Sequence, residues 1–369
     1  MKITLNYAGN GDCILIESMN AAILVDGGTA NSFTKWKDKI ESLDKLDCVI
    51  VTHIDSDHVN GIIKLIDSKS QKKPIIERVL YNGAEQILGY EYLDIDLPDD
   101  YLLDSLSARV SDIALDEINI GTSEGTSLSF ILNSRSINTN SLAIHNDLDN
   151  DIKIGDLSIK MIGPTQDSLM KLKEHWLATL NDDGITRKIV NKSHAAAFES
   201  YINSLEDSFS VEVSNEEVNS IDALADFDYS SDTSLANETS LAFLVVENDK
   251  SVLMLGDSHA ETVIDWLNKN GIEKLKVDAV KISHHGSKNN INRELMSRFE
   301  CDTYLISTNG KIFKHPDFET LAVIAKYSSC ENCRIFVNNN IEHIKNDFTS
   351  RLKEYNNTEL SFNIQEVEI

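Results

Sequence analysis

Several apolar segments of this sequence end in aspartate or histidine, and this pattern constrains the fold more than any other feature. Asp26 closes "AAILVDGG", His53 ends "LDCVIVTH", Asp257 ends "SVLMLGD", and His284 and His285 follow "VDAVKIS". Each segment has the pattern of a β-strand, and an apolar run such as "LDCVIVTH" is typical of a strand buried on both faces. Ligand sites in open α/β sheets lie outside the carboxyl ends of strands. We therefore expect an α/β fold that gathers these side chains at one sheet edge.

The residues that begin at His53 are dense in side chains that bind metals. The stretch "HIDSDH" contains His53, Asp55, Asp57 and His58. A lone His-x-Asp on a turn is more often a cap or a surface pair, but a cluster of this density costs stability unless a cation lies in it. Imidazole and carboxylate groups are ligands of zinc, manganese and iron. The stretch therefore predicts a metal site, and a bridging carboxylate would suit two ions.

Two regular parts of the chain enclose a less regular one. Strand and helix patterns alternate over residues 1–90 and 235–325, whereas residues 91–235 mix acidic loops with helical patterns. We expect residues 1–369 to form one domain in which 91–235 is an irregular and helical insert that walls the site. No Lys or Arg occurs between Lys192 and Lys250. Such a run is typical of a solvated loop, and a lid over the site is the alternative.

Composition bears on partners and location. The net charge is −26 and the hydrophobic fraction is 41%, which fits a globular chain and argues against a broad basic face for duplex DNA. No stretch approaches the roughly 20 apolar residues of a membrane-spanning helix, and the N-terminus lacks the pattern of a signal peptide. We expect a cytoplasmic protein without a membrane segment.

The motifs resemble those of the metallo-β-lactamase superfamily, whose metal motif is HxHxDH, with Asp55 in the place of its second histidine. The stretches "HIDSDHVNG", "MLGDSH" and "ISHHGSKN" are most similar to the soluble hydrolase domain of the ComEC/Rec2 DNA-uptake family. The match covers residues 1–90 and 235–325. The resemblance implies an αββα sandwich of two mixed β-sheets, with helices outside and metals at one edge between the sheets.

The resemblance implies two divalent metal ions, zinc or manganese, with magnesium as a further option. Six residues would hold them: His53, Asp55, Asp57, His58, Asp257 and His284. Asp57, His58 and His284 would share one ion, His53 and Asp55 would hold the other, and Asp257 would bridge the two. Asp55 in place of a histidine hardens the site and shifts its preference from zinc toward manganese or magnesium. The histidine that the superfamily carries upstream of the bridging aspartate has no counterpart among Asn237, Thr239 and Ser240.

Other residues would act around the metals. Asp26 would orient histidine ligands through their other ring nitrogen, and His285 is either a ligand or, as we favour, a donor beside the ligands. In relatives a His-Pro pair approaches the site, so His315 would contact a phosphate oxygen or protonate a leaving group. Three residues at an expected helix start would bind an anion through backbone N–H groups: Ser287, Lys288 and Asn289.

We expect hydrolysis of a phosphodiester, with Asp57 orienting the attacking water. The acidic charge disfavours long polyanions, so the substrate would be short or single-stranded nucleic acid, a nucleotide, or DNA brought by a protein partner. Two alternatives stay open. One is hydrolysis of a carboxylic ester, thioester or lactam on the same metals, and the other is a partner-bound regulatory subunit with a degenerate site.

Overall fold

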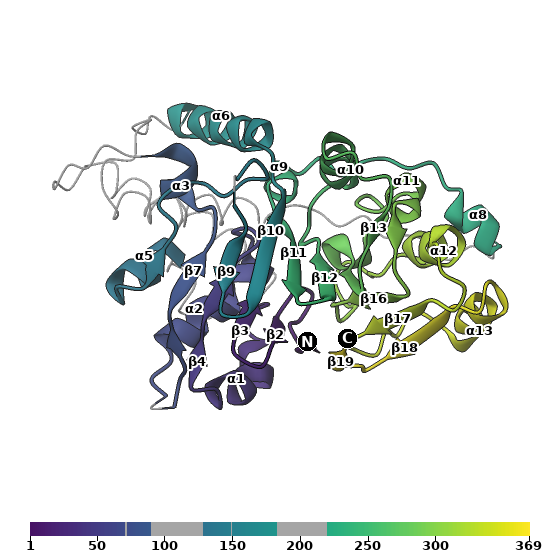
Figure 1. The fold of residues 1–369 in the computed structure, drawn as a ribbon, viewed down its shortest axis with the longest axis horizontal. Coiled ribbons are helices and arrows are strands. Elements are labelled where there is room, and N and C mark those ends of the chain that lie inside the picture. Colours follow the sequence, from purple (N-terminus) through teal and green to yellow (C-terminus); the bar gives the residue numbers. More distant parts are fainter. Residues whose placement is uncertain (71, 90–127, 149, 183–219) are drawn as a thin grey trace.

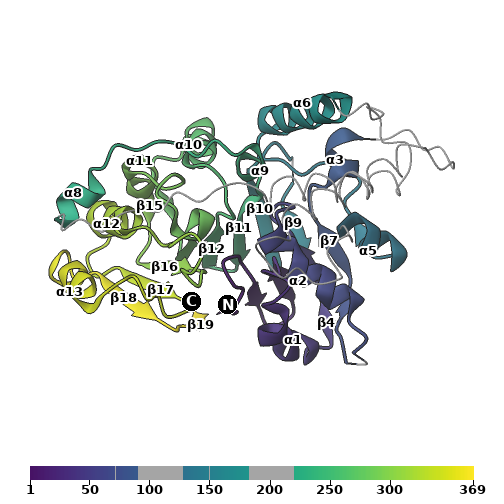
Figure 2. The same cartoon turned by 180° about the vertical axis from the view of Figure 1, so that it is seen from behind.

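The computed structural model describes residues 1–70, 72–89, 128–148, 150–182 and 220–369. Two large β-sheets pack face to face, and helices cover their outer sides (Figures 1 and 2). In Figure 1 helices α1 (Phe33–Glu41) and α2 (Ser56–Asp67) lie on the left. Helices α10 (Ala260–Lys269), α11 (Arg293–Ser297), α12 (Phe318–Tyr327) and α13 (Asn346–Glu354) lie on the right. The expected αββα sandwich is confirmed.

The first sheet has seven strands in the order β19-β1-β2-β3-β5-β7-β8. Their bounds are β1 (Lys2–Leu5), β2 (Ile14–Glu17), β3 (Ala22–Val25), β5 (Cys48–Ile50), β7 (Arg78–Leu80), β8 (Asn138–Thr139) and β19 (Glu366–Glu368). Strands β19, β1, β2 and β3 are antiparallel, and β3, β5, β7 and β8 are parallel. The parallel part brings the carboxyl ends of β3 and β5 together.

The second sheet has eight strands in the order β18-β17-β16-β14-β12-β11-β10-β9. Their bounds are β9 (Ile152–Ile154), β10 (Leu157–Gly163), β11 (Ala242–Glu247), β12 (Lys250–Met254), β14 (Ala279–Lys281), β16 (Thr303–Ile306), β17 (Arg334–Val337) and β18 (Glu359–Phe362). Strand β12 is parallel to β14, which is parallel to β16. Two small parallel pairs complete the described strands: β4 (Lys45–Leu46) with β6 (Ile75–Ile76), and β13 (Leu275–Lys276) with β15 (Phe299–Glu300).

The alternation of side chains along the strands explains the layers. In β2, Ile14 and Ile16 belong to the core between the sheets, whereas Leu15 belongs to the core under the N-terminal helices. In β12, Val252 points into the same inner core and Leu253 into the core under the C-terminal helices. Both faces of these two strands are therefore buried, which is why such segments have the pattern of continuous apolar runs.

Helices cover the outer face of each sheet. The helices whose side chains join the N-terminal outer core are α1 (Phe33–Glu41), α2 (Ser56–Asp67), α3 (Ala84–Leu88), α5 (Leu128–Ser134) and α6 (Gln166–Asp182). Those that join the C-terminal outer core are α8 (Ile221–Ala225), α10 (Ala260–Lys269), α11 (Arg293–Ser297), α12 (Phe318–Tyr327) and α13 (Asn346–Glu354). The short α9 (Leu235–Glu238) contacts α6.

The segment between residues 91 and 235 differs from the irregular insert that we expected. Residues 138–163 contain β8, β9 and β10, so this part of the segment supplies strands to both sheets. Residues 90–127 and 183–219 lie outside the described part of the chain. Among the described residues, no helix combines the length and the apolar character that crossing a bilayer requires.

Candidate metal centre

The carboxylate of Asp257 is the point on which the candidate site converges. It follows β12, and its Oδ2 lies 3.4 Å from Nε2 of His58, 3.5 Å from that of His285, and 3.9 Å from those of His53 and His284. Ligand atoms bound about 2.0–2.1 Å from a tetrahedral ion lie about 3.3 Å apart. The spacing around Asp257 is therefore close to that of groups that share a cation.

The same atoms lack partners within the protein. In the described part of the chain, Nε2 of His53, His58 and His285 is buried without a hydrogen-bond partner, and so is Oδ1 of Asp257. Buried polar atoms are nearly always paired in folded proteins. A cation among these atoms would satisfy them all, so the residues present fit a metal.

In His53 and His58, the ring nitrogen Nδ1, which lies opposite Nε2, is held in place by neighbouring side chains. Nδ1 of His58 lies 2.8 Å from Oδ2 of Asp26, which is fully buried. Nδ1 of His53 lies 3.0 Å from Oγ1 of Thr52, and that hydroxyl donates to the Asp26 carboxylate at 2.8 Å. Asp26 thus lies where it can fix a histidine ligand, the position that the sequence suggests for it.

The two consecutive histidines that follow β14 are also held, each by different partners at Nδ1. Nδ1 of His284 lies 2.9 Å from Oδ1 of Asn290 and 3.3 Å from Oδ2 of Asp232. Nδ1 of His285 lies 2.9 Å from the carbonyl oxygen of Ser307, which accepts the ring proton. The sequence gives no signal for Asp232, because it comes from an acidic loop far from the metal motif.

The ligand groups differ from the expected division. Ligand atoms of Asp57, His58 and His285 all lie within 4.8 Å of one another, as do those of His53, His58 and Asp257. His285 thus occupies the place beside Asp57 and His58 that we expected for His284. Oδ2 of Asp55 lies 3.4 Å from Nε2 of His53, as a shared ion between them would require.

The exchange of the two histidines has a backbone cause. Residues Ser283–Gly286 form a 3₁₀ turn in which His284 and His285 have φ of 45° and 55°. Two successive residues in the left-handed region send their side chains in directions that strand alternation does not predict. His285 is 2% exposed and points inward, whereas the side chain of His284 is 28% exposed at the rim.

Asp57 lies in the first turn of α2 and is fixed by the β1–β2 loop. Its Oδ2 accepts a hydrogen bond of 2.8 Å from Nδ2 of Asn10. Gly11 permits this approach, since a Cβ at Gly11 would lie 1.7 Å from the Asp57 carbonyl oxygen. Glycine is therefore required at position 11, because a side chain there would clash with the metal motif.

A buried ion pair lies next to His285 of the candidate site. Lys281 in β14 is fully buried, and its ammonium pairs with Asp12 of the β1–β2 loop. Oδ1 of Asp12 also lies 3.4 Å from Nδ1 of His285. Burial alone would raise the pKa of Asp12, but Lys281 and His285 outweigh it and lower the pKa to about 2. Asp12 stays charged and joins the two sheets beneath a ligand.

The three residues expected to bind an anion are occupied elsewhere. The predicted helix start at Ser287 is wrong, since α11 begins at Arg293. The backbone N–H of Lys288 donates to Asp317 at 2.9 Å, and that of Asn289 donates to Oγ of Ser287 at 3.2 Å. These N–H groups therefore do not face a ligand.

His315 lies beside the centre. Its ring centroid is 5.6 Å from that of His284, and its Nδ1 lies 3.4 Å from Oδ2 of Asp317. Burial lowers the pKa of His315 below its ordinary value, and Asp317 only partly opposes this. The imidazole is therefore mainly neutral at pH 7.

Comparison with known proteins agrees with this architecture. Residues 6–131, which include Asp12, Asp26 and the "HIDSDH" stretch, match the family model described as the metallo-beta-lactamase superfamily. The chain has the metallo-β-lactamase fold. The match is to the superfamily as a whole, and the narrower resemblance to the ComEC/Rec2 group finds no support in it. A search of curated proteins finds no match to the sequence.

Solved structures with this fold align along the whole chain at low identity. They include the metallo-beta-lactamase fold protein YhfI from Bacillus subtilis (11% identity, TM-score 0.39, 100% of this chain and 99% of that one). Zn²⁺-bound PqqB from Methylobacterium extorquens has 11% identity and a TM-score of 0.40, with 100% of both chains covered. The short form of human tRNase Z has 11% identity and a TM-score of 0.36, with 100% of this chain and 99% of that one covered.

Asn237 and Ser240, where we expected no ligand histidine, contact the candidate ligands or the residues that orient them. Nδ2 of Asn237 donates to Oδ2 of Asp232 at 2.8 Å. Oγ of Ser240 lies 3.3 Å from Nδ1 of His53 and accepts the backbone N–H of Asp257 at 3.0 Å. This stretch of the metallo-β-lactamase fold therefore positions candidate ligands here instead of supplying one.

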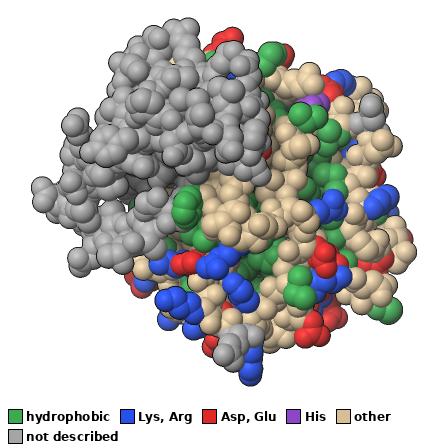
Figure 3. Space-filling model, turned by 90° about the vertical axis from the view of Figure 1, so that its left-hand side faces the viewer, with side chains coloured by type: hydrophobic (Ala, Val, Ile, Leu, Met, Phe, Trp, Pro, Cys, Tyr) green, Lys and Arg blue, Asp and Glu red, His purple; other side chains and the backbone are tan. Residues whose placement is uncertain are grey.

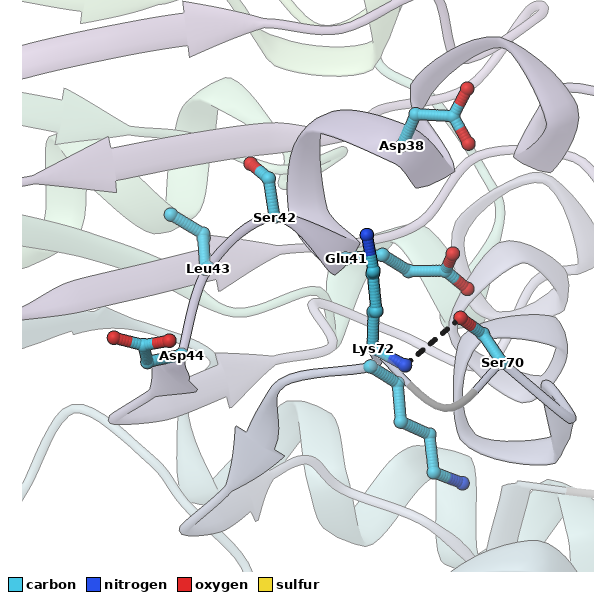
Figure 4. Close-up of a pocket in the computed structure, with 8 residues that line it drawn as sticks. Asp38, Glu41, Ser42, Leu43, Asp44, Ser70 and Lys72 are labelled. Atoms are coloured by element: carbon cyan, nitrogen blue, oxygen red, sulfur yellow. Dashed lines mark hydrogen bonds between the residues drawn. The ribbon is translucent and has the colours of Figure 1, made fainter.

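A cleft with a volume of about 670 Å³ lies away from this centre, between the end of α1 and Ser70. Its lining mixes Asp38, Glu41 and Asp44 with Lys72 and Lys73 (Figure 4). Basic and acidic side chains also lie together on the described surface of the face that Figure 3 shows, which is the left-hand side of the molecule in Figure 1. Such mixed charge gives no single ligand class, and we base the function on the Asp257 centre.

We expect metal to stabilise the protein more as pH rises. Burial would lower the pKa of His58, but Asp257, Asp26 and Asp57 outweigh it and raise the pKa well above its ordinary value. Burial is likewise outweighed at His284, where Asp257 and Asp232 raise the pKa to about 9. Protonated rings thus stabilise the metal-free protein fully below pH 6.5, and this contribution of about 1–3 kcal/mol is lost as pH rises toward 9.

A cation needs neutral rings, so its binding strengthens over the same range. The difference in Tm between Mn²⁺-loaded and EDTA-treated protein should widen from pH 6 to pH 8.5. A difference that stayed constant or narrowed would contradict protonation of these rings in the metal-free state.

Replacing Asp232 with asparagine should weaken metal binding by about 10–100-fold, since loss of a group that orients a ligand has effects of this size. The asparagine keeps the shape but removes the charge beside Nδ1 of His284. Affinity would be measured by competition with a chromophoric chelator. Asp228→Asn, an exposed residue of the same segment, is the matched control, and equal affinities in both variants would count against a positioning role for Asp232.

Proposed function

We propose that the protein is a metal-dependent hydrolase of phosphodiesters. The observation that carries the proposal is the convergence of four histidine Nε2 atoms on Oδ2 of Asp257 at 3.4–3.9 Å. Two carboxylates, Asp55 and Asp57, lie against these histidines at 3.4–3.9 Å. The donor set suits two divalent ions of intermediate hardness, zinc or manganese, with magnesium as a further option.

Charge favours a phosphodiester over a neutral ester, thioester or lactam. Asp55, Asp57 and Asp257 bring three negative charges, and two divalent ions bring four positive ones. Before a bound water loses its proton, the loaded centre would keep about one positive charge, which a singly charged phosphodiester neutralises and a neutral substrate does not. When bound, the two ions would activate a water and stabilise charge on the phosphoryl oxygens.

Other residues of the chain would orient the water, the substrate and the histidine ligands. One oxygen of Asp57 accepts from Asn10 at 2.8 Å, which fixes the carboxylate so that its other oxygen can accept a proton from the attacking water. His315 is mainly neutral at pH 7, so its N–H would donate to a phosphate oxygen rather than deliver a full proton to the leaving group. Asp232 and Asp26 would hold the histidines in orientation.

The test is turnover with defined metals. The protein, stripped with chelator and reloaded with Mn²⁺, Zn²⁺ or Mg²⁺, would be given bis-p-nitrophenyl phosphate, single- and double-stranded DNA, RNA and cyclic dinucleotides. p-Nitrophenyl acetate and a chromogenic β-lactam would serve as rival substrates. Cleavage of phosphodiesters that is lost in Asp57→Ala and His58→Ala supports the proposal. Turnover of the rival substrates alone, or of none with any metal, would reject it.

A further inference from the structure

The loop that precedes His315 exposes apolar side chains next to the candidate centre. Ile312 is 52% exposed and Phe313 is 36% exposed, in a loop that is flanked by the buried Gly310 and Pro316. Local hydrogen bonds order the start of this loop. Gly310 N–H donates to Thr308 Oγ1 at 3.2 Å, and Lys311 N–H donates to Asn309 Oδ1 at 2.9 Å. Exposed apolar side chains beside a polar site are typical of a binding surface.

Aromatic rings connect this loop to the centre. The rings of Phe313 and His315 are stacked, with centroids 6.1 Å apart and planes 17° from parallel. The His315 ring lies 5.6 Å from that of His284, whose Nε2 is 3.9 Å from Asp257. A flat group stacked on Phe313 would therefore lie one ring beyond His315, within reach of a phosphate at the centre.

Two lysines flank the exposed ring. Lys311 and Lys314 adjoin Ile312 and Phe313 in sequence, and neither forms a side-chain ion pair with any residue that the structure describes. In a chain of net charge −26, two such cations beside an exposed aromatic ring are a local exception. Stacking rings combined with unpaired cations are how proteins hold single-stranded nucleic acid without reading its sequence.

We propose that Phe313, Lys311 and Lys314 form a subsite for a nucleobase and the phosphates adjoining it, next to the scissile phosphodiester. The substrate class is then a nucleotide diester with an unstacked base, which is either a small nucleotide or the end of a single strand. A duplex does not qualify, because its base faces are covered by their neighbours. This inference rests on the proposed phosphodiesterase function for its kinetic test but not for its binding test.

The kinetic test compares two substrates that share a leaving group. They are thymidine 5′-(p-nitrophenyl phosphate) and methyl p-nitrophenyl phosphate, which differ only in the nucleoside. The ratio of their kcat/KM values should fall about tenfold in Phe313→Ala and be restored in Phe313→Trp, since stacking of one base has an effect of this size. Phe130→Ala, an exposed phenylalanine of α5 (54% exposed), is the matched control. An unchanged ratio in Phe313→Ala would overturn the proposal.

The binding test does not need turnover. Fluorescence anisotropy of labelled oligo(dT) and of labelled dinucleotide would be measured on the metal-loaded protein at several salt concentrations. Phe313→Ala should weaken both ligands, whereas Lys311→Gln with Lys314→Gln should weaken the oligonucleotide more and flatten its salt dependence. Equal weakening of both ligands by the lysine changes identifies a small nucleotide as the substrate. Wild-type binding in all variants rejects the subsite, even if hydrolysis itself is observed.

Discussion

Replacing Asp257 with alanine is expected to remove both metal ions and to lower kcat/KM for phosphodiester hydrolysis by a factor of about 10³ or more. Four histidine nitrogens face Oδ2 of this residue at 3.4–3.9 Å, so its carboxylate contacts more of the candidate ligands than Asp55 or Asp57 does. Without this carboxylate, the candidate centre would lose a negatively charged ligand, and the remaining histidines would hold a cation less tightly. The loss should therefore exceed that of any residue that only orients a ligand.

Metal content by mass spectrometry and turnover of bis-p-nitrophenyl phosphate would measure the effect. Asp265→Ala is the matched control, because Asp265 is exposed on α10 just beyond the site. Asp257→Asn adds a second comparison, since it keeps the shape and removes the charge. Retention of two metal equivalents in both Asp257 variants would show that Asp257 does not bridge ions.

Replacing Lys281 with methionine is expected to lower the free energy of unfolding of the metal-free protein by about 3–5 kcal/mol. Lys281 is fully buried, pairs with Asp12, and donates to the carbonyl oxygen of Gly256 at 3.3 Å. The change leaves Asp12 charged or forces it to take up a proton, and both outcomes are costly in a dry interior. The penalty arises from the orphaned carboxylate more than from the lost lysine.

A double variant separates these causes. Asp12→Asn with Lys281→Met removes both charges and should recover a large part of the stability, measured as the denaturant midpoint in EDTA. Lys250→Met is the control, because Lys250 forms an ion pair of 3.3 Å with Asp278 at the solvent-exposed start of β12, and its loss should change stability by less than about 1 kcal/mol. A double variant no more stable than Lys281→Met would show that the lysine contributes through packing alone.

The layered fold follows from local patterns in the sequence. Apolar runs such as "LDCVIVTH" indicate strands buried on both faces, and the structure places β5 between β3 and β7 in the parallel part of its sheet. Strand ends also indicate where the site lies, because parallel strands deliver Asp26 and the residues after β5 to the same edge. Periodicity and turn residues carry this information within each segment.

The finer arrangement of the site depends on contacts that no local pattern encodes. Asp12 meets Lys281 and His285 only after the two sheets pack, and Asp232 reaches His284 from a loop with no regular pattern. The order of His284 and His285 depends on two positive φ values in a short turn. Hydrophobic spacing contains no signal for either feature, so the sequence alone does not tell which of the two consecutive histidines points inward.

The distribution of ligands along the chain has a consequence for biosynthesis. His53, Asp55, Asp57 and His58 are translated early, whereas Asp257 and His285 leave the ribosome only after most of the chain has been made. N-terminal segments generally begin to fold during synthesis, but here the half made first holds its histidines without the carboxylate that completes the cluster. Loading of the proposed metal centre would therefore be a late event, because it waits for Asp257 and His285 to join the histidines of the first half.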